Sequence, residues 1–329
     1  MRGWIRGLGL TVVMSGAWMA LSAFSPPPPE IKLALQAHST AAWEMAAMEE
    51  LRLDVQNEIK LKVRKVADTK AARAALEAGR ADVVLADFLW TSAQRGEGAD
   101  VTFVPYSLAA GGLMALPDGK VKSVADLKGA TLAVAGEPGD IGYLILRAYY
   151  HAGTGGDLTT DATTVFGTAA EVNGQLLGGQ ADAALDARDF GAPAAVGGAT
   201  VIASLPDMLK ELGASKTPPL VGWVFSEEFA AKEPETIKRF LDASSQTRAQ
   251  LLTDDALWER IRPAMKIDDD ALFIALRDAY RAGIVTSYDE SDIEAAKETY
   301  ALLAKSGAGE LTGGKPDLAE GTFWAGYRK

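Results

Sequence analysis

The segment GEPGD (136–140) has the residue types and spacing of a ligand-binding turn. It follows the apolar run ATLAVA (130–135) and precedes the helix-favouring stretch IGYLILRAYY (141–150). A glycine-rich turn at that point leaves helix N-terminal amides free to contact a ligand. The glycines recur every third residue, which is not the G-x-G-x-x-G spacing of a dinucleotide loop, and no Gly-Lys-Ser/Thr follows. Glu137 and Asp140 would repel a pyrophosphate, so the turn predicts a ligand other than a nucleotide.

Other polar and aromatic side chains lie at the ends of predicted strands. The candidate ligand-binding residues are Gln36, His38, Trp43, Asp87, Trp90, Glu137, Gly139, Asp140, Asp186 and Arg188. The two tryptophans could stack on a ring or a cation, with core packing as the alternative. His38 either donates to a ligand or caps the next helix. Asp87 either meets a charged partner or caps a helix, and Arg188 could instead form a surface ion pair with a neighbouring aspartate.

The charge balance of these loops bears on the class of solute. Six carboxylates, counting Glu171, stand against Arg95, Arg188 and the titratable His38. Coulomb energy therefore favours a neutral or cationic solute, such as an amine or an aromatic compound. A helix N-terminus can hold an anion without a basic side chain, so an anionic solute remains open.

The composition offers little material for catalysis. The 329 residues include no cysteine and only two histidines, which excludes thiolate metal sites, disulfides and a cysteine nucleophile. The chain has no G-x-S-x-G motif and no cluster of carboxylates at metal-ligand spacing. We therefore expect a binding protein, with no catalytic residue, no metal site and no cofactor. The net charge of -11 argues against nucleic acid as a partner.

The first residues have the pattern of an export signal. Arg2 and Arg6 precede the apolar stretch Leu8–Ala20, and small residues after it offer a cleavage site. This stretch is short for a membrane span, although an uncleaved anchor is the alternative. We therefore predict a signal peptide over residues 1–23 and a stiff proline-rich spacer over residues 24–30.

The sequence repeats one pattern at an interval of about a hundred residues. In LEAGRADVVLAD (76–87) and LGGQADAALDA (177–187), a helix-favouring stretch stops at a glycine, and Ala-Asp leads into a short apolar strand. Upstream, residues 31–50 and 130–150 both run strand, polar loop and helix. Alternating strands and helices are typical of parallel α/β sheets, so the repeat predicts two α/β lobes.

Two further strands are predicted to connect these lobes. The segment SLAAGGLMAL (107–116) would carry the chain out of the first lobe, and LVGWVF (220–225) would return it. We expect lobe 1 to comprise 31–112 and 220–329 and lobe 2 to comprise 113–219, with a hinge and a ligand cleft between them. Four helices are predicted after the return strand, at 234–252, 254–265, 268–281 and 289–305. Pro263 is expected to end or kink its helix.

These motifs, taken in order, resemble the ABC-transporter solute-binding proteins of the nitrate/sulfonate/taurine type, which include binders of thiamine precursors. The run KSVADLKGATLAVAGEPGDIGYLILRAYYHAG, from Lys122, resembles the family pattern S-x-x-D-L-K-G-K-x-x-A-V. Residues 76–107 and 176–190 resemble its helix, strand and ligand loop in the first and second lobes. SEEFAAKEPETIKRFLDAS (226–244) resembles its return to the C-terminal helices.

The resemblance implies a two-lobe type II periplasmic binding protein fold that closes around a small-molecule solute. It also implies delivery to an ABC permease with its separate ATPase, a periplasmic location, no stable membrane insertion after processing, and a monomer. A periplasmic sensor or partner-binding protein that uses the same cleft is the alternative. An enzyme resembling the thiamine-precursor synthases is disfavoured, because their cysteine-rich motif is absent here.

Two departures from the family pattern concern the ligand. Sulfonate and nitrate binders often present small hydroxyl residues where this chain has Glu137 and Asp140. The second-lobe strand of the family usually ends near an aromatic-Glu-Pro sequence, whereas ARDF occupies 187–190 here. Both differences argue against an oxyanion ligand.

Overall fold

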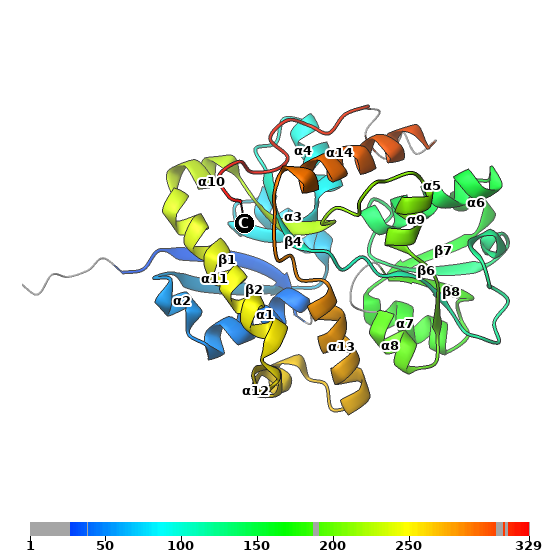
Figure 1. Ribbon diagram of the computed structural model, residues 1–329, viewed down its shortest axis with the longest axis horizontal. Coiled ribbons are helices and arrows are strands. Elements are labelled where there is room, and N and C mark those ends of the chain that lie inside the picture. Colours follow the sequence, from blue (N-terminus) through cyan, green and yellow to red (C-terminus); the bar gives the residue numbers. More distant parts are fainter. Residues whose placement is uncertain (1–26, 38, 187–190, 307–311, 313–314, 329) are drawn as a thin grey trace, which may run out of the picture.

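The computed structural model describes residues 27–37, 39–186, 191–306, 312 and 315–328. Its strands form two five-stranded sheets that lie side by side, each flanked by helices (Figure 1). The predicted signal peptide (1–23), His38 and Arg188 lie outside the described residues. The first strand begins at Glu30, the last residue of the predicted spacer.

The first sheet has the strand order β2-β1-β3-β10-β4. Its strands are β1 (Glu30–Gln36), β2 (Lys60–Val66), β3 (Val83–Asp87), β4 (Thr102–Ser107) and β10 (Val221–Phe225). Strands β1, β2 and β3 pair in parallel, whereas β10 is antiparallel to both β3 and β4. All five residues of β3 and of β10 are buried, because helices cover both faces of the sheet centre.

The second sheet repeats this plan with the order β7-β6-β8-β5-β9. Its strands are β5 (Gly112–Ala115), β6 (Thr131–Ala135), β7 (Thr163–Gly167), β8 (Ala183–Asp186) and β9 (Thr200–Ser204). Strands β6, β7 and β8 are parallel, and β5 is antiparallel to β8 and β9. The predicted strand-helix alternation holds for the three parallel strands of each sheet, and one further strand of each sheet is antiparallel to its neighbours. That strand arrives from the other sheet and enters its own sheet in the opposite direction.

The helices of the N-terminal half and of the second sheet fit the predicted alternation. They are α1 (Thr40–Glu50), α2 (Leu53–Gln56), α3 (Thr69–Glu77), α4 (Phe88–Gly96), α5 (Ile141–Thr154), α6 (Leu158–Asp161), α7 (Ala169–Leu177), α8 (Gly191–Val196) and α9 (Leu205–Glu211), with a short 3₁₀ helix at Val124–Leu127. The glycines predicted to stop α3 and α7 have φ values of 65° and 68° at Gly79 and Gly179. This left-handed conformation is strained for other residues and costs glycine little.

The C-terminal part is helical, as the sequence predicts. It contains α10 (Glu227–Lys232), α11 (Pro234–Thr253), α12 (Asp255–Met265), α13 (Asp270–Ala282) and α14 (Glu290–Lys305). Pro263 lies inside α12, which ends two residues later at Met265 with Lys266 in the left-handed conformation. The proline thus stands in the last turn, near the helix end that it was expected to cause.

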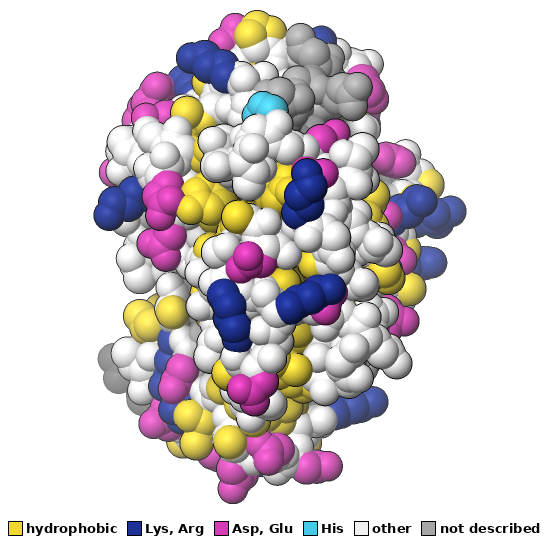
Figure 2. Space-filling view, turned by 90° about the vertical axis from the view of Figure 1, so that its right-hand side faces the viewer, with side chains coloured by type: hydrophobic (Ala, Val, Ile, Leu, Met, Phe, Trp, Pro, Cys, Tyr) yellow, Lys and Arg dark blue, Asp and Glu magenta, His cyan; other side chains and the backbone are white. Residues whose placement is uncertain are grey.

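The buried apolar side chains form three clusters. The largest of them includes residues from strands of both sheets. One smaller cluster joins α1, α12 and α13 around Trp258, and the other lies in the second sheet around Met114. On the face in Figure 2, acidic and basic side chains are interspersed with apolar ones. Within the described ranges, no helix is both long enough and apolar enough to span a membrane.

Candidate functional site

Asp87 ends β3 at the centre of the first sheet and is 3% exposed. Its Oδ1 accepts a hydrogen bond from the Trp90 amide at 2.8 Å, which caps α4. Its Oδ2 accepts from Nη2 of Arg73 at 2.7 Å. The structure confirms that Asp87 caps a helix and gives this carboxylate a basic partner within the chain.

Arg73 also contacts the glycine-rich turn of the second sheet. Its Nη2 donates to Oδ1 of Asp140 at 3.1 Å, and its Nη1 lies 3.9 Å from Oε2 of Glu137. Asp140 precedes α5, and its Oδ2 accepts from the Glu137 amide at 3.0 Å. One guanidinium from α3 thus joins carboxylates that follow strands of both sheets.

The surroundings of Arg73 remove it from solvent. The residue is 7% exposed, and its guanidinium carbon lies 5.0 Å from the centre of the half-buried Trp90 ring. This arrangement has the geometry of a cation–π contact. Sequence reasoning did not select Arg73, although it lies on the helix face that also carries the buried Thr69 and Ala72. The position of Arg73 on the buried face of a helix could have indicated that it pairs with a buried carboxylate.

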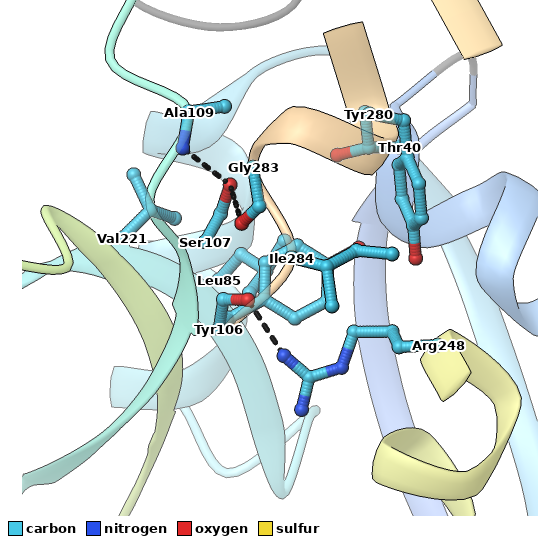
Figure 3. Close-up of a pocket in the computed structure, with 10 residues that line it drawn as sticks. All are labelled: Thr40, Leu85, Tyr106, Ser107, Ala109, Val221, Arg248, Tyr280, Gly283 and Ile284. Carbon is cyan, nitrogen blue, oxygen red and sulfur yellow. Dashed lines mark hydrogen bonds between the residues drawn. The ribbon is translucent and has the colours of Figure 1, made fainter. Parts of the chain in front are cut away.

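Next to this cluster, the first sheet contains a small pocket with a cavity volume of about 20 Å³, which opens to solvent (Figure 3). Val221 lines the pocket and is the register partner of both Asp87 and Ser107, so the pocket borders the Arg73 cluster. The lining residues come from β3, β4, β10, α1, α11, α13 and nearby turns: Thr40, Leu85, Tyr106, Ser107, Ala109, Val221, Arg248, Tyr280, Gly283 and Ile284. The pocket therefore lies at the edge where β3 and β4 end, the usual place for ligands in α/β sheets.

The remaining sequence candidates occupy different surroundings. Gln36 ends β1, and its carbonyl accepts from the Ser39 hydroxyl at 2.9 Å. Trp43 is 3% exposed and packs in the cluster around Trp258, which is the core-packing alternative. Gly139 is exposed in the turn before α5. Asp186 ends β8, is 2% exposed, and accepts from the Asn173 side chain at 3.5 Å.

The structure thus brings together Asp87, Trp90, Glu137 and Asp140 through Arg73, and it places Trp43 in a core cluster. Whether any of these residues contacts a solute stays a prediction. The charged groups of the Arg73 cluster, of the pocket surroundings and of the end of β8 include the carboxylates Glu44, Asp87, Glu137, Asp140 and Asp186 and the guanidinium groups of Arg73 and Arg248. Acids outnumber bases in this set, as they do in the predicted loops.

Comparison with known families and structures agrees with this architecture. The family described as "NMT1/THI5 like" matches residues 55–255, which is more than half of the chain. No curated protein has a sequence that matches this chain.

Solved structures with the same fold include three named binding proteins. The alkanesulfonate-binding protein SsuA from Xanthomonas axonopodis pv. citri, bound to MOPS, superposes with a TM-score of 0.70 at 18% identity, covering 91% of this chain and 99% of that chain. The periplasmic aliphatic sulphonate binding protein SsuA from Escherichia coli gives 0.69 at 17% identity, with 91% and 92% covered. The periplasmic nitrate-binding protein NrtA from Synechocystis PCC 6803 gives 0.59 at 15% identity, with 79% and 71% covered. At these identities the similarity establishes the two-lobe α/β fold.

Proposed function

Because the chain belongs to the NMT1/THI5-like family, we propose that it is an exported solute-binding protein of an ABC import system. It captures a small organic molecule between its two lobes and delivers that molecule to a membrane permease with a separate ATPase. The named proteins of the same fold bind sulfonates or nitrate and include periplasmic proteins. Their fold supports the proposed role.

The observation that carries this proposal is the contact between the strand ends of the two sheets. Arg73 from one sheet's helix layer contacts Asp140 and Glu137 from the other, and the pocket of Figure 3 lies beside this contact. A solute at this edge would be reached by side chains of both sheets. Closure of the sheets around it would exclude water, as in hinge-type binding proteins.

The proposed lobes follow the chain crossings. Lobe 1 comprises 31–112 and 220–329, and lobe 2 comprises 113–219. The first crossing lies between β4 and β5, and the second lies between β9 and β10. Two crossings form a hinge that permits rotation of one sheet against the other.

For the solute, we propose a neutral or cationic small molecule. The carboxylates at the strand ends outnumber the arginines, and Arg73 is already paired with Asp87 and Asp140. An anion would have to compete with these carboxylates for the guanidinium, whereas a cation would reduce their mutual repulsion.

We also propose that the processed chain acts in the periplasm as a monomer. The proposal includes no stable membrane insertion, no nucleic acid partner, no cofactor and no catalytic step. The absence of cysteine and the presence of only two histidines support a role in binding.

The decisive experiment is native mass spectrometry of protein purified from the periplasm without refolding. The proposal expects a non-covalent solute in a one-to-one complex, released unchanged on denaturation. Isothermal titration with the recovered compound should then give saturable one-site binding. A chemically converted solute, or a failure of every recovered or added compound to bind, would contradict the proposed function.

A further inference from the structure

A carboxylate is buried directly behind the pocket of Figure 3. Glu44 lies on α1 and is 0% exposed. The Tyr280 hydroxyl donates to its Oε2 at 3.1 Å, and Arg248 Nε lies 3.9 Å from the same oxygen. Its Oε1 has no hydrogen-bond partner of normal geometry among the described residues. Burial raises the pKa of Glu44, and the positive charge of Arg248 opposes that rise.

Packing alone does not account for an acidic residue at this position. The buried positions of α1 are otherwise Ala41, Trp43, Met45, Ala47 and Met48. An apolar side chain of similar volume at a buried ionic position is often as stable as the ion pair. Glu44 instead keeps one carboxylate oxygen outside any hydrogen bond of normal geometry, although the Ser244 and Tyr106 hydroxyls lie close to the carboxylate. A buried charge with so little satisfaction is unfavourable unless these neighbours or a ligand use it.

Two tyrosines connect this carboxylate to the pocket. Tyr106 and Tyr280 line it and are 3% and 5% exposed. Burial, together with the charge of Glu44, raises the pKa of both hydroxyls well above 10.0, so both stay protonated at neutral pH. The Tyr280 proton is donated to Glu44, which leaves its oxygen as an acceptor. The Tyr106 hydroxyl lies close to Glu44, Tyr280 and Thr40, and it meets normal hydrogen-bond geometry with none of the described residues.

Arg248, the basic residue of the lining, is already engaged by the protein. Its Nη1 donates to the Tyr106 carbonyl at 2.6 Å, and its Nε donates to the Ser244 carbonyl at 3.4 Å. Its guanidinium carbon also lies 5.1 Å from the centre of the Tyr106 ring. Figure 3 shows the Arg248 side chain below the pocket, with one nitrogen bonded to the Tyr106 carbonyl. Arg248 therefore balances the charge of Glu44 and holds Tyr106 in place.

We infer that Tyr106, Tyr280 and Glu44 form a recognition subsite for a hydrogen-bond donor group of the solute, such as an amine or a protonated nitrogen heterocycle. This inference rests on the proposed function and specifies its substrate class. The donor group binds the tyrosine oxygens, and Glu44 supplies negative potential behind them. A sulfonate at the same place would bring acceptor oxygens towards the carboxylate.

The test compares head groups on fixed carbon skeletons. The processed full-length chain is titrated with benzylamine, benzamidine, benzyl alcohol and benzenesulfonate, with the corresponding butyl compounds, with nitrate, and with any solute that co-purifies. Melting temperature reports binding, and calorimetry gives the Kd of each compound that stabilises the chain. The inference expects amines and amidines to raise the melting temperature, and alcohols and oxyanions to have smaller effects.

Variants then assign the effect to the subsite. Glu44→Gln keeps the side-chain shape and the acceptor for Tyr280, and it should weaken donor solutes roughly 10- to 100-fold. Tyr280→Phe and Tyr106→Phe should weaken them by roughly 5- to 10-fold, and they serve as the test if Glu44→Gln does not fold. Glu49→Gln, an exposed carboxylate on the same helix, should bind like the wild type.

The outcomes separate the inference from the proposed function. If no solute co-purifies and no compound stabilises the chain, the proposed function fails and the inference fails with it. If sulfonates or nitrate alone bind, the role in solute binding stands, whereas the proposed neutral or cationic solute class and the inference are both overturned. It is also overturned if amines bind and the folded Glu44 and tyrosine variants retain wild-type affinity.

Discussion

At the scale of single residues, Arg73 changes the interpretation of the acidic loops. Counting charges along the sequence includes Asp87, Glu137 and Asp140 in the excess of carboxylates that favours a neutral or cationic solute. In the structure, Arg73 donates to Asp87 and Asp140, and it lies within 3.9 Å of Glu137. The excess of negative charge at this edge is therefore smaller than the loops alone indicate. The carboxylates of Asp140 and Glu137 interact with Arg73 and so link the second sheet to the first.

Replacement of Arg73 by methionine should destabilise the protein. It would remove the guanidinium that pairs with the buried Asp87 carboxylate, at a cost of about 3–5 kcal/mol in the free energy of unfolding. Urea denaturation followed by circular dichroism measures the change. Lys70→Met, at an exposed position of the same helix, should change stability by less than about 0.5 kcal/mol. Adding Asp87→Asn to Arg73→Met should recover part of the loss, and equal stability of Arg73→Met and wild type would contradict this assignment.

The two candidate tryptophans should respond differently to truncation. Trp43 is buried in a core cluster, so Trp43→Ala should lower the free energy of unfolding by about 3–5 kcal/mol. Trp90 is half-buried against Arg73, so Trp90→Ala should destabilise less and should reduce solute affinity. Denaturation and calorimetry on both variants separate these effects. Wild-type affinity in Trp90→Ala would remove its proposed stacking role.

At the scale of elements, local sequence patterns predicted most boundaries. The helix predicted at 234–252 is α11 with one more residue at its end, and the helices predicted at 254–265 and 289–305 are α12 and α14, each of which begins one residue later. These elements follow from apolar periodicity, a proline at a helix start and glycines at helix ends, all of which are local. The antiparallel direction of β5 and β10 was missed, because it depends on how the chain crosses between sheets.

The site was predicted less completely because its contacts join distant residues. Arg73 bonds to Asp140 across 67 positions of the sequence, and Tyr280 bonds to Glu44 across 236. Arginine and glutamate in predicted helices are normally solvent-exposed, so nothing local distinguished these two. Strand-end residues such as Asp87 and Asp140 were predictable, because parallel strands deliver their carboxyl ends to one edge.

The turn before α5 should depend on one glycine. Gly136 has a φ of 123°, and an added Cβ would collide with Oδ2 of Asp140. Gly136→Ala should therefore cost about 1–3 kcal/mol of stability and should weaken solute binding by displacing Asp140. Gly139→Ala is the matched control, since no atom lies within 4 Å of the Cβ that it would add. Thermal melts and calorimetry should show a clear loss for the first variant only, and equal effects would refute this role for Gly136.

At the scale of the whole molecule, export of the chain is directly testable. Arg2, Arg6 and the apolar stretch after them predict removal of an N-terminal segment and release of a soluble protein. Cell fractionation and intact-mass measurement should place a chain shortened by about 20 residues in the periplasmic fraction. A full-length chain found only in the cytosol would contradict the prediction. Replacing both arginines with glutamate should block export.

Closure of the two lobes should depend on the Arg73 contact, because it joins residues of both sheets beside the pocket. The natural chain has no cysteine, so Lys62→Cys on β2 and Lys128→Cys before β6 introduce two unique, exposed sites for spin labels. Pulsed dipolar spectroscopy should show a shorter and narrower distance distribution when a saturating solute is added. Asp140→Asn removes one charge from the contact and should shift the solute-free distribution towards longer distances.

Asp157→Asn provides the control for that shift. Asp157 is an exposed aspartate that caps α6 in the same proposed lobe, and its side chain accepts from Thr159. This variant should leave the distance distribution as in the labelled parent. If solute shortens the distance in the parent and Asp140→Asn behaves like Asp157→Asn, closure occurs without the ion pair. The Arg73 contact would then only stabilise the local fold. If solute changes neither the mean distance nor its width, the hinge motion itself is refuted, whatever the affinity of the solute.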